Sequence, residues 1–370
     1  MFAKKNFLFT SESVCAGHPD KICDQISDAI LDEVLKKDPY GRVAVETLVT
    51  KNRAVIVGEV TANAKINYGD VARTQIKRLG YIKNIFDFSD LSPIEIYIHE
   101  QSQEIAVGVD NKGAGDQGMM FGYACRQTKG LMPLPIVLAH KLARILDQTR
   151  ETKKIPYLYP DGKTQVTLEY KDGKPHKIRK IVIAVPHEEK IDFNQVKSDV
   201  FKNVVLPVVE SFGLSTKEDD FILNGTGVWH KGGPASDSGL TGRKIVVDTY
   251  GGYVRVGGGC FSGKDPTKVD RSGAYAARFI AKNIVANNLA DEVEIGLAYF
   301  IGAKKPVMFE IETFGTSKKP DQVIKDFSEK ILDCSVEGIL RGLSLRKPIY
   351  LPTASYGHFG REEFPWEKIV

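Results

Sequence analysis

The first third of the chain has a hydrophobic pattern that predicts a helix, a β-hairpin and a second helix. Across residues 20–37 an apolar residue recurs at every fourth position, which places one apolar stripe along a helix: Ile22, Ile26, Ile30 and Val34. Two runs of β-forming residues follow, at 42–49 and 54–62. A second helical pattern covers residues 70–79. Together these elements indicate one α/β unit.

The same order of elements is predicted twice more. In the middle third the elements are helix 134–150, strands 165–170 and 178–185, and helix 195–212. In the last third they are helix 271–287, strands 293–301 and 307–314, and helix 321–332. Two shorter runs, 245–248 and 253–256, are also expected to be strands. We therefore predict an α/β (α+β) fold of three structurally similar domains. Glycine-rich polar stretches suggest domain limits at 1–102, 113–231 and 232–370.

Composition and charge exclude several classes of protein. The 370 residues include 51 basic and 47 acidic side chains, and the net charge of +4 is too evenly spread for a nucleic-acid-binding surface. No apolar run approaches the roughly 18 residues of a membrane helix, and MFAKKNFLF lacks a signal-peptide core. The five cysteines form no CxxC pair, which argues against a zinc ribbon or a disulfide framework. We expect a cytoplasmic protein that binds neither nucleic acid nor membrane.

One glycine-rich segment partly matches a phosphate-binding P-loop. Gly258, Gly263 and Lys264 fit the pattern GxxxxGK. However, Asp265 stands where a Ser or Thr should bind Mg²⁺, and the helix-breaking Pro266 follows. The segment suits a polyphosphate without being a P-loop, and an ordinary glycine turn with solvated lysines is the alternative.

Three polar segments that contain glycine precede the leading helices of the three units, namely TSESVCAGHPDK, GAGDQG and GGGCFSGKDPTKVD. Because backbone N–H groups at helix N-termini suit anionic ligands, we expect the site at these entrances, around Asp20, Asp116 and Asp270. Asp20 and Asp270 stand at similar positions in two units, which favours a shared metal ion. A simple interaction of each carboxylate with its helix dipole is the alternative. His18 could act on a leaving oxygen or merely cap its helix.

The sequence around the other candidate residues does not by itself decide between a binding role and a structural role. In DSGLTGRK, Arg243 and Lys244 could bind phosphate or could be a solvated basic pair before a strand. Asp161-Gly162-Lys163 is expected to be a surface turn. Glu46 and Glu59 lie in largely apolar β runs, where a partly buried carboxylate needs a cation or a hydrogen-bond donor.

Long segments in the same order across nearly the whole chain resemble the S-adenosylmethionine synthetase family. They are TSES…GHPDK, GAGDQGMMFGYA, DSGLTGRKIVVDTYGG, GGGCFSGKDPTKVDRSGAYAARFIAKNIV and YGHFGR…FPWEK. The resemblance implies three related domains about a pseudo-threefold axis. It also implies a homodimer with active sites shared between the subunits, commonly assembled into a homotetramer.

The reaction implied by the resemblance is S-adenosylmethionine synthesis, the work of a methionine adenosyltransferase in one-carbon metabolism. Methionine sulfur would attack C5′ of ATP in line and expel the triphosphate, which is then hydrolysed to pyrophosphate and phosphate. Two Mg²⁺ ions and K⁺ would be the cofactors. Because a triphosphate leaves from carbon, cations must neutralise its growing charge.

Matching motifs assign roles to individual residues. The catalytic residues would be His18, Lys163, Arg243 and Lys264. ATP would also contact Asp161, Trp229, Asp237, Lys244 and Cys260. Methionine would lie near Glu59, Gln101, Asp237 and Lys268. Asp20 and Asp270 would bind Mg²⁺, and Glu46 would bind K⁺. Residues 103–112 would form a mobile loop over the site.

The chain departs from the family pattern where the nucleotide is expected. The family usually reads GRFVIGGPxGD, whereas residues 227–237 read GVWHKGGPASD. Val228 cannot supply an arginine's charge, Ser236 replaces a glycine, and Trp229 offers a larger ring for stacking. Cys260 stands where alanine is common. A catalytically weakened, ATP-binding regulatory homologue is therefore one alternative function, and a P-loop phosphotransferase is another.

Overall fold

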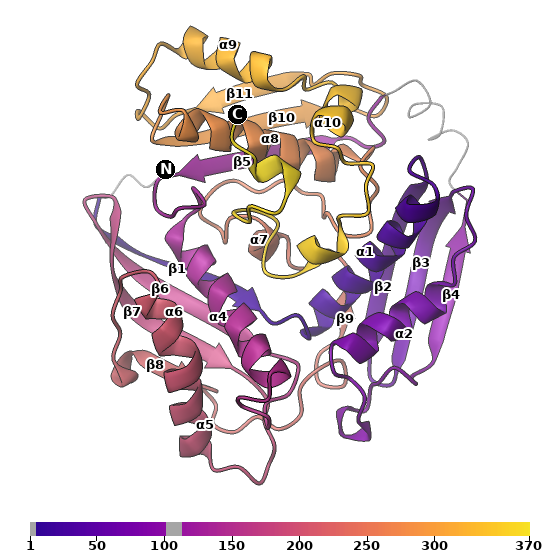
Figure 1. The fold of residues 1–370 in the computed structure, drawn as a ribbon, viewed down its shortest axis with the longest axis vertical. Coiled ribbons are helices and arrows are strands. Elements are labelled where there is room, and N and C mark those ends of the chain that lie inside the picture. Colours follow the sequence, from indigo (N-terminus) through magenta and orange to yellow (C-terminus); the bar gives the residue numbers. More distant parts are fainter. Residues whose placement is uncertain (1–4, 101–112) are drawn as a thin grey trace.

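In the part of the chain that the structure describes, three β-sheets surround three long central helices (Figure 1). The computed structural model describes residues 5–100 and 113–370. The central helices are α1 (Pro19–Lys37), α4 (Leu134–Glu151) and α8 (Val269–Ala286). Each packs on its own sheet, so the molecule consists of three α/β units about a pseudo-threefold axis, as predicted.

The first sheet has the strand order β4-β3-β2-β9. Strands β2 (Arg42–Thr50) and β3 (Arg53–Thr61) form the predicted hairpin, and β4 (Ile94–His99) lies parallel to β3. Helix α2 (Tyr68–Arg78) packs against α1. The predicted helix, hairpin and helix of this unit are confirmed.

The second sheet has the order β1-β6-β7-β8. Strands β6 (Lys163–Lys171) and β7 (Lys174–Ala184) form its hairpin, and β8 (Phe221–Leu223) lies parallel to β7. The predicted helix 195–212 comprises α5 (Phe193–Val200), a π-helical turn (Phe201–Val205) and α6 (Leu206–Glu210). Pro207 has no N–H to donate, which accounts for the widened turn before it.

The third sheet has the order β11-β10-β5. Strands β10 (Glu292–Tyr299) and β11 (Met308–Glu312) form the hairpin, and helix α9 (Asp321–Ile331) packs against α8. Helix α10 (Val336–Gly342) also contacts α8. The predicted elements of this unit are confirmed as well.

Each sheet borrows one strand from a different third of the sequence. Strand β1 (Phe7–Val14) pairs antiparallel with β6, β5 (Gly118–Cys125) with β10, and β9 (Gly239–Leu240) with β2. The three segments proposed as domains therefore each contribute strands to two sheets. This cyclic exchange brings β9 and the residues that follow it against the first unit.

Two predicted strands are wrong. Residues 245–248 form a single helical turn, α7 (Ile245–Asp248), and residues 253–256 form no strand. Gly251 and Gly252 both have positive φ and turn the chain between the two runs. The apolar side chains that suggested strands instead fill the core from a compact turn, since Val247, Tyr250 and Tyr253 are buried.

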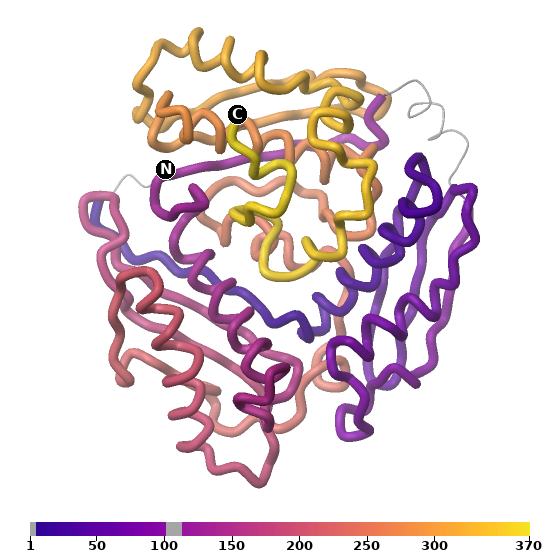
Figure 2. Tube along the Cα trace, in the orientation of Figure 1, coloured from indigo at the N-terminus to yellow at the C-terminus, as the bar shows by residue number. Residues whose placement is uncertain are grey.

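The C-terminal segment, residues 343–370, is yellow in Figure 2. It contacts all three central helices. Asp32 of α1 accepts hydrogen bonds from the amides of Tyr350 and Leu351, and Asp147 of α4 accepts one from the Tyr356 hydroxyl. Glu367 forms ion pairs with α8. This segment therefore ties the three units together. No helix in the described part of the chain is long and apolar enough to cross a bilayer.

Candidate functional site

A first cluster of charged residues lies at the N-terminus of α1. His18 is the N-cap, and Asp20 occupies the second helical position. The Asp20 carboxylate accepts a hydrogen bond from the Leu240 amide (2.9 Å), forms an ion pair with Lys244, and lies 3.6 Å from Arg243. Burial alone would raise the pKa of Asp20, but the Lys244 hydrogen bond and the Leu240 amide lower it overall. The cluster is thus an anion surrounded by cations.

Residues 161–163 and 233–237 join this first cluster. Asp161 is buried, and its carboxylate accepts hydrogen bonds from the amides of Gly162 (2.7 Å) and Gly233 (2.8 Å). The prediction that Asp161 lies in a surface turn is therefore wrong. Its buried carboxylate accepts a hydrogen bond from the amide of the buried Gly233. Burial raises the pKa of Asp161 to about 6. The same turn brings Asp237 to 4.0 Å from Nε2 of His18.

His18 is neutral at physiological pH. Burial, followed by the charges of Lys244 and Lys163, lowers the pKa of His18 to about 3. Its Nδ1 accepts a hydrogen bond from the Asp20 amide, so the tautomer with a proton on Nε2 fits this bond. That Nε2 is buried and has no hydrogen-bond partner among the described residues. A neutral imidazole donor therefore lies near the charges of Lys244 and Lys163, next to Asp20.

A second cluster lies at the N-terminus of α8. Lys264 forms an ion pair with Asp270 (2.6 Å) and lies 3.9 Å from Asp116. Burial alone would lower the pKa of Lys264, but Asp270 raises it overall. Cys260 lies close by, and burial raises the pKa of its thiol although Lys264 opposes this. The thiol is therefore protonated at neutral pH.

The two clusters repeat one arrangement. Asp20 and Asp270 each occupy the second position of a central helix, and each pairs with a lysine. The corresponding position of α4 is Pro135, which carries no charge. Asp116 precedes β5 instead and lies beside the α8 entrance. We predicted polar site residues at the N-termini of three helices, but the structure places them at two, α1 and α8. The reason is that strand β5 separates GAGDQG from α4.

The other predicted site residues differ in their surroundings. Lys268 is buried and pairs with Asp265 (2.6 Å). Glu46 is exposed on β2, contrary to the expected partial burial, because it faces away from α1. Glu59 lies 3.1 Å from Nε2 of His99. Gln101 and the loop 103–112 lie outside the described residues.

Three of the departures from the family pattern, Val228, Trp229 and Ser236, lie in one turn. The Lys231 carbonyl accepts hydrogen bonds from Nε1 of Trp229 (2.8 Å) and from Oγ of Ser236 (2.6 Å). The Lys231 ammonium pairs with Asp87 (2.6 Å). Val228 is exposed. Trp229 and Ser236 therefore both hold the Lys231 carbonyl and close the turn that carries Asp237.

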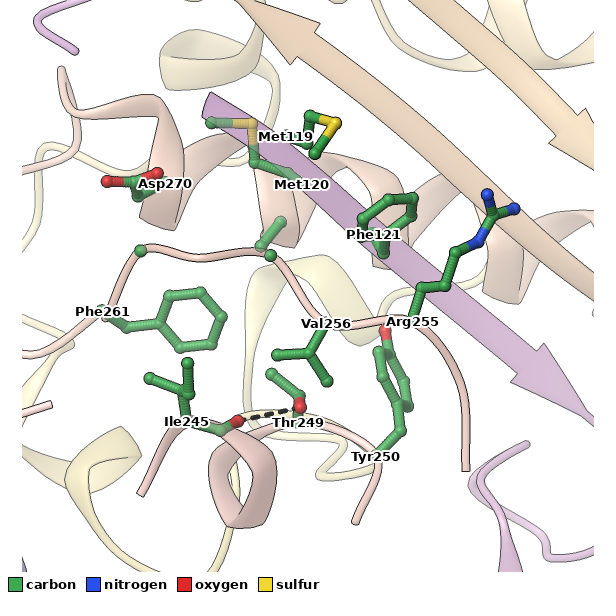
Figure 3. Close-up of a pocket in the computed structure, with 13 residues that line it drawn as sticks. Met119, Met120, Phe121, Ile245, Thr249, Tyr250, Arg255, Val256, Phe261 and Asp270 are labelled. Carbon is green, nitrogen blue, oxygen red and sulfur yellow. Dashed lines mark hydrogen bonds between the residues drawn. The ribbon is translucent and has the colours of Figure 1, made fainter. Parts of the chain in front are cut away.

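A small cavity beside Asp270 is too small for a substrate. It is lined by apolar side chains that include Met120, Val256 and Phe261, with Asp270 at one end and Arg255 at the other (Figure 3). Its volume of about 10 Å³ would hold one water at most. This cavity therefore cannot hold a nucleotide.

The donor set fits Mg²⁺ better than a metal caged by protein. Within residues 5–100 and 113–370, no group of three or more His, Cys, Asp or Glu side chains could hold a metal ion. Mg²⁺ commonly uses only one or two carboxylates together with substrate phosphates and water. Asp20 and Asp270 each offer one such carboxylate, which is now paired with a lysine ammonium.

Comparison with known proteins decides the family. Models of the N-terminal, central and C-terminal domains of S-adenosylmethionine synthetase match residues 6–103, 111–229 and 231–368. The chain belongs to the S-adenosylmethionine synthetase family. It is 50% identical over 379 residues to the S-adenosylmethionine synthase of Clostridium tetani (strain Massachusetts / E88), covering 98% of this chain and 97% of the relative. The identity and both coverages are the same for the S-adenosylmethionine synthase of Clostridium botulinum (strain Alaska E43 / Type E3). Members of this family use a divalent metal ion and K⁺.

Proposed function

We propose that this chain synthesises S-adenosylmethionine from ATP and L-methionine and hydrolyses the released triphosphate to pyrophosphate and phosphate. The observation that carries the proposal is the convergence of Lys163, Arg243 and Lys244 on His18 and Asp20. Nucleophilic attack at C5′ builds negative charge on the departing triphosphate, and fixed cations stabilise that charge. Lys163 and the adjacent pair Arg243 and Lys244 come from two distant parts of the sequence, which supports a common anionic ligand.

Individual roles follow from the chemistry of each side chain. The neutral His18 would donate a hydrogen bond to the departing O5′ region. Arg243 and Lys264 would hold phosphates, together with Lys163 and Lys244. Asp20 and Asp270 would each hold one Mg²⁺, which neutralises phosphate charge when bound. Asp161 would fix the turn that presents Asp237.

The remaining contacts are assigned in the same way. Trp229 would stack on adenine, since its indole N–H is already bonded to Lys231. Cys260 would lie beside the phosphates held by Lys264. Methionine would contact Glu59, Gln101, Asp237 and Lys268. Glu46, exposed on the sheet face, would contribute a hard carboxylate to a K⁺ site.

We propose that two copies of the chain share each active site and that such dimers pair into a tetramer. On the outer face of the first sheet, register places Leu240 opposite Leu48, and Val57 next to Glu46 and Tyr97. These apolar side chains are exposed in the single chain, which supports the proposal that another subunit covers them in an assembly. Because Glu46 lies among them, a partner subunit would cover the same face that carries ligands. A solution mass equal to one chain would contradict this arrangement.

The decisive experiment incubates purified protein with ATP, L-methionine, Mg²⁺ and K⁺. We expect a methionine-dependent sulfonium product together with pyrophosphate and phosphate. ATP binding without turnover would favour the regulatory homologue, which the full-length similarity to synthases disfavours. ADP formation would favour a phosphotransferase, although α8 begins at Val269, five residues after Lys264, unlike a P-loop helix. The five free cysteines support a reducing, cytoplasmic setting for this reaction.

Gly242→Ala should damage catalysis through the loop that carries Arg243. Gly242 has φ +80°, and an added Cβ would lie 2.5 Å from Cβ of Cys260. Misplacing the loop should lower kcat/KM about tenfold or more. The double variant Gly242→Ala/Cys260→Gly should recover part of this loss, because the clash is removed.

Gly252→Ala is the matched control for this prediction. Gly252 has the same φ of +80°, but the nearest atom to an added Cβ is 3.8 Å away. Backbone strain alone should leave kcat/KM within about threefold of the wild type. Steady-state kinetics of the three variants distinguish the effect of backbone strain from that of displacing the loop that carries Arg243. Equal losses of kcat/KM in Gly242→Ala and Gly252→Ala would contradict the prediction.

A further inference from the structure

Four aspartates form a row along α1. Asp20, Asp24, Asp28 and Asp32 recur at every fourth residue, so they lie on one face of the helix. All four are at least 95% buried. Four buried carboxylates in a line are costly unless each is satisfied by hydrogen bonds or charges.

Each aspartate of the row accepts hydrogen bonds from the backbone of a distant segment. Asp20 accepts from Leu240, Asp24 from Gly242, and Asp28 from Gly263, each at 2.9 Å. Asp32 accepts from Tyr350 and Leu351. The row therefore fixes, in order along α1, the segment 239–244, the segment 259–268 and the C-terminal segment.

Asp24 and Asp28 each accept a hydrogen bond from a glycine amide at the turn of a loop, Gly242 and Gly263 respectively. Gly242 and Gly263 have φ of +80° and +79°, a conformation in which glycine is favoured. Lys244 follows Gly242 by two residues, and Lys264 follows Gly263 directly. These lysines pair with Asp20 and Asp270. Each loop thus turns at a glycine whose amide is held by α1 and then presents a cation to the site.

Each of the two middle aspartates is paired with a buried cation. Asp24 pairs with Lys21 (3.0 Å), which also pairs with Asp248. Asp28 forms a two-pronged ion pair with Arg271, at 2.7 and 2.9 Å. These partners are fully buried, so neither aspartate is available to a substrate.

We propose that Asp24 and Asp28 are positioning residues that set the two phosphate-binding loops, Asp24 the segment 239–244 and Asp28 the segment 259–268. This inference rests on the proposed function, because it concerns cations assigned there to the triphosphate. A hydrogen bond to a buried carboxylate is stronger than one between neutral groups, and α1 is a rigid support. Arg243 and Lys244 are thereby placed before ATP arrives.

The test compares Asp24→Ala with Asp24→Asn. Both variants remove one of the two carboxylate charges that face Lys21, but only asparagine keeps an oxygen that can accept from the Gly242 amide. We expect Asp24→Ala to raise KM for ATP about tenfold and to lower kcat, whereas Asp24→Asn stays within about threefold of the wild-type KM. A loss of folded protein alone would lower apparent kcat and leave KM unchanged.

Hydrogen exchange measured by mass spectrometry gives a second, local readout. In Asp24→Ala, peptides that contain Gly242 should exchange about tenfold faster, while those that contain Gly263 should not change. Asp28→Ala should show the reverse pattern. Asp32→Ala is the matched control from the same row, and it should affect only peptides that contain Tyr350 and Leu351.

Equal KM values for Asp24→Ala and Asp24→Asn, or unchanged exchange at Gly242, would overturn the inference. If Asp24→Ala does not fold, Asp24→Leu takes its place, because leucine fills the buried volume, offers no acceptor to the Gly242 amide, and leaves Lys21 paired with Asp248. Absence of a sulfonium product from the wild type would instead refute the proposed function. The exchange of Gly242 would still report on Asp24 in that case.

Discussion

Replacing Asp20 by asparagine is expected to lower methionine-dependent turnover by about a hundredfold to a thousandfold while the protein stays folded. Asparagine keeps an oxygen that can accept from the Leu240 amide, so the local fold is retained. It removes the negative charge that faces Lys244 and that would hold Mg²⁺. Steady-state turnover at several Mg²⁺ concentrations, with circular dichroism to verify folding, measures the effect.

Asp70→Asn is the matched control for this variant. Asp70 is likewise the acidic residue in the first turn of a helix, α2, but it is exposed and lies outside both charged clusters. If Asp20 acted only through its helix dipole, the two substitutions would have similarly small effects. Full activity of Asp20→Asn would remove Asp20 from the proposed metal site.

Glu367→Ala is expected to lower the free energy of unfolding by about 3–5 kcal/mol. Glu367 is buried, and its carboxylate accepts hydrogen bonds from Arg278 (2.9 Å at both oxygens), Lys282 (2.8 Å) and the Gly360 amide (2.7 Å). Its removal leaves two buried cations without their shared anion, and it releases the C-terminal segment from α8. Urea titration followed by circular dichroism measures the change.

Glu363→Ala serves as the control for this stability prediction. Glu363 pairs with Arg361 at 2.8 Å, but its side chain is 53% exposed. A pair with a solvent-exposed carboxylate contributes about 0–1 kcal/mol, and Arg361 keeps its hydrogen bonds to the carbonyls of Pro352 and Ser355, so this variant should unfold close to the wild type. A similar loss in both variants would mean that the C-terminal segment is held by general packing and not by the buried Glu367 pairs.

Local patterns were sufficient to predict most elements of the fold. The four-residue apolar repeat of α1 and the paired β runs of each unit are periodic, and periodicity survives without knowledge of the partners. The failures at 245–248 and 253–256 have a common cause. Short apolar runs bury their side chains equally well from a turn or a strand, and only the surrounding core decides between the two.

The sequence by itself determined the family, the three repeated units and the identity of the charged residues, because long motifs and periodic elements are local properties. The tertiary structure alone decided how these residues meet. Each sheet contains one strand from a neighbouring unit. Asp116 lies at the N-terminus of α8 and not at that of α4, and Asp161 is buried against the Gly233 amide. The structure also showed that Asp20, Asp24, Asp28 and Asp32, whose spacing indicates only a shared helix face, form a row of acceptors for segments 218–318 residues away in the chain. Such pairings depend on long-range packing, which a one-dimensional pattern does not contain.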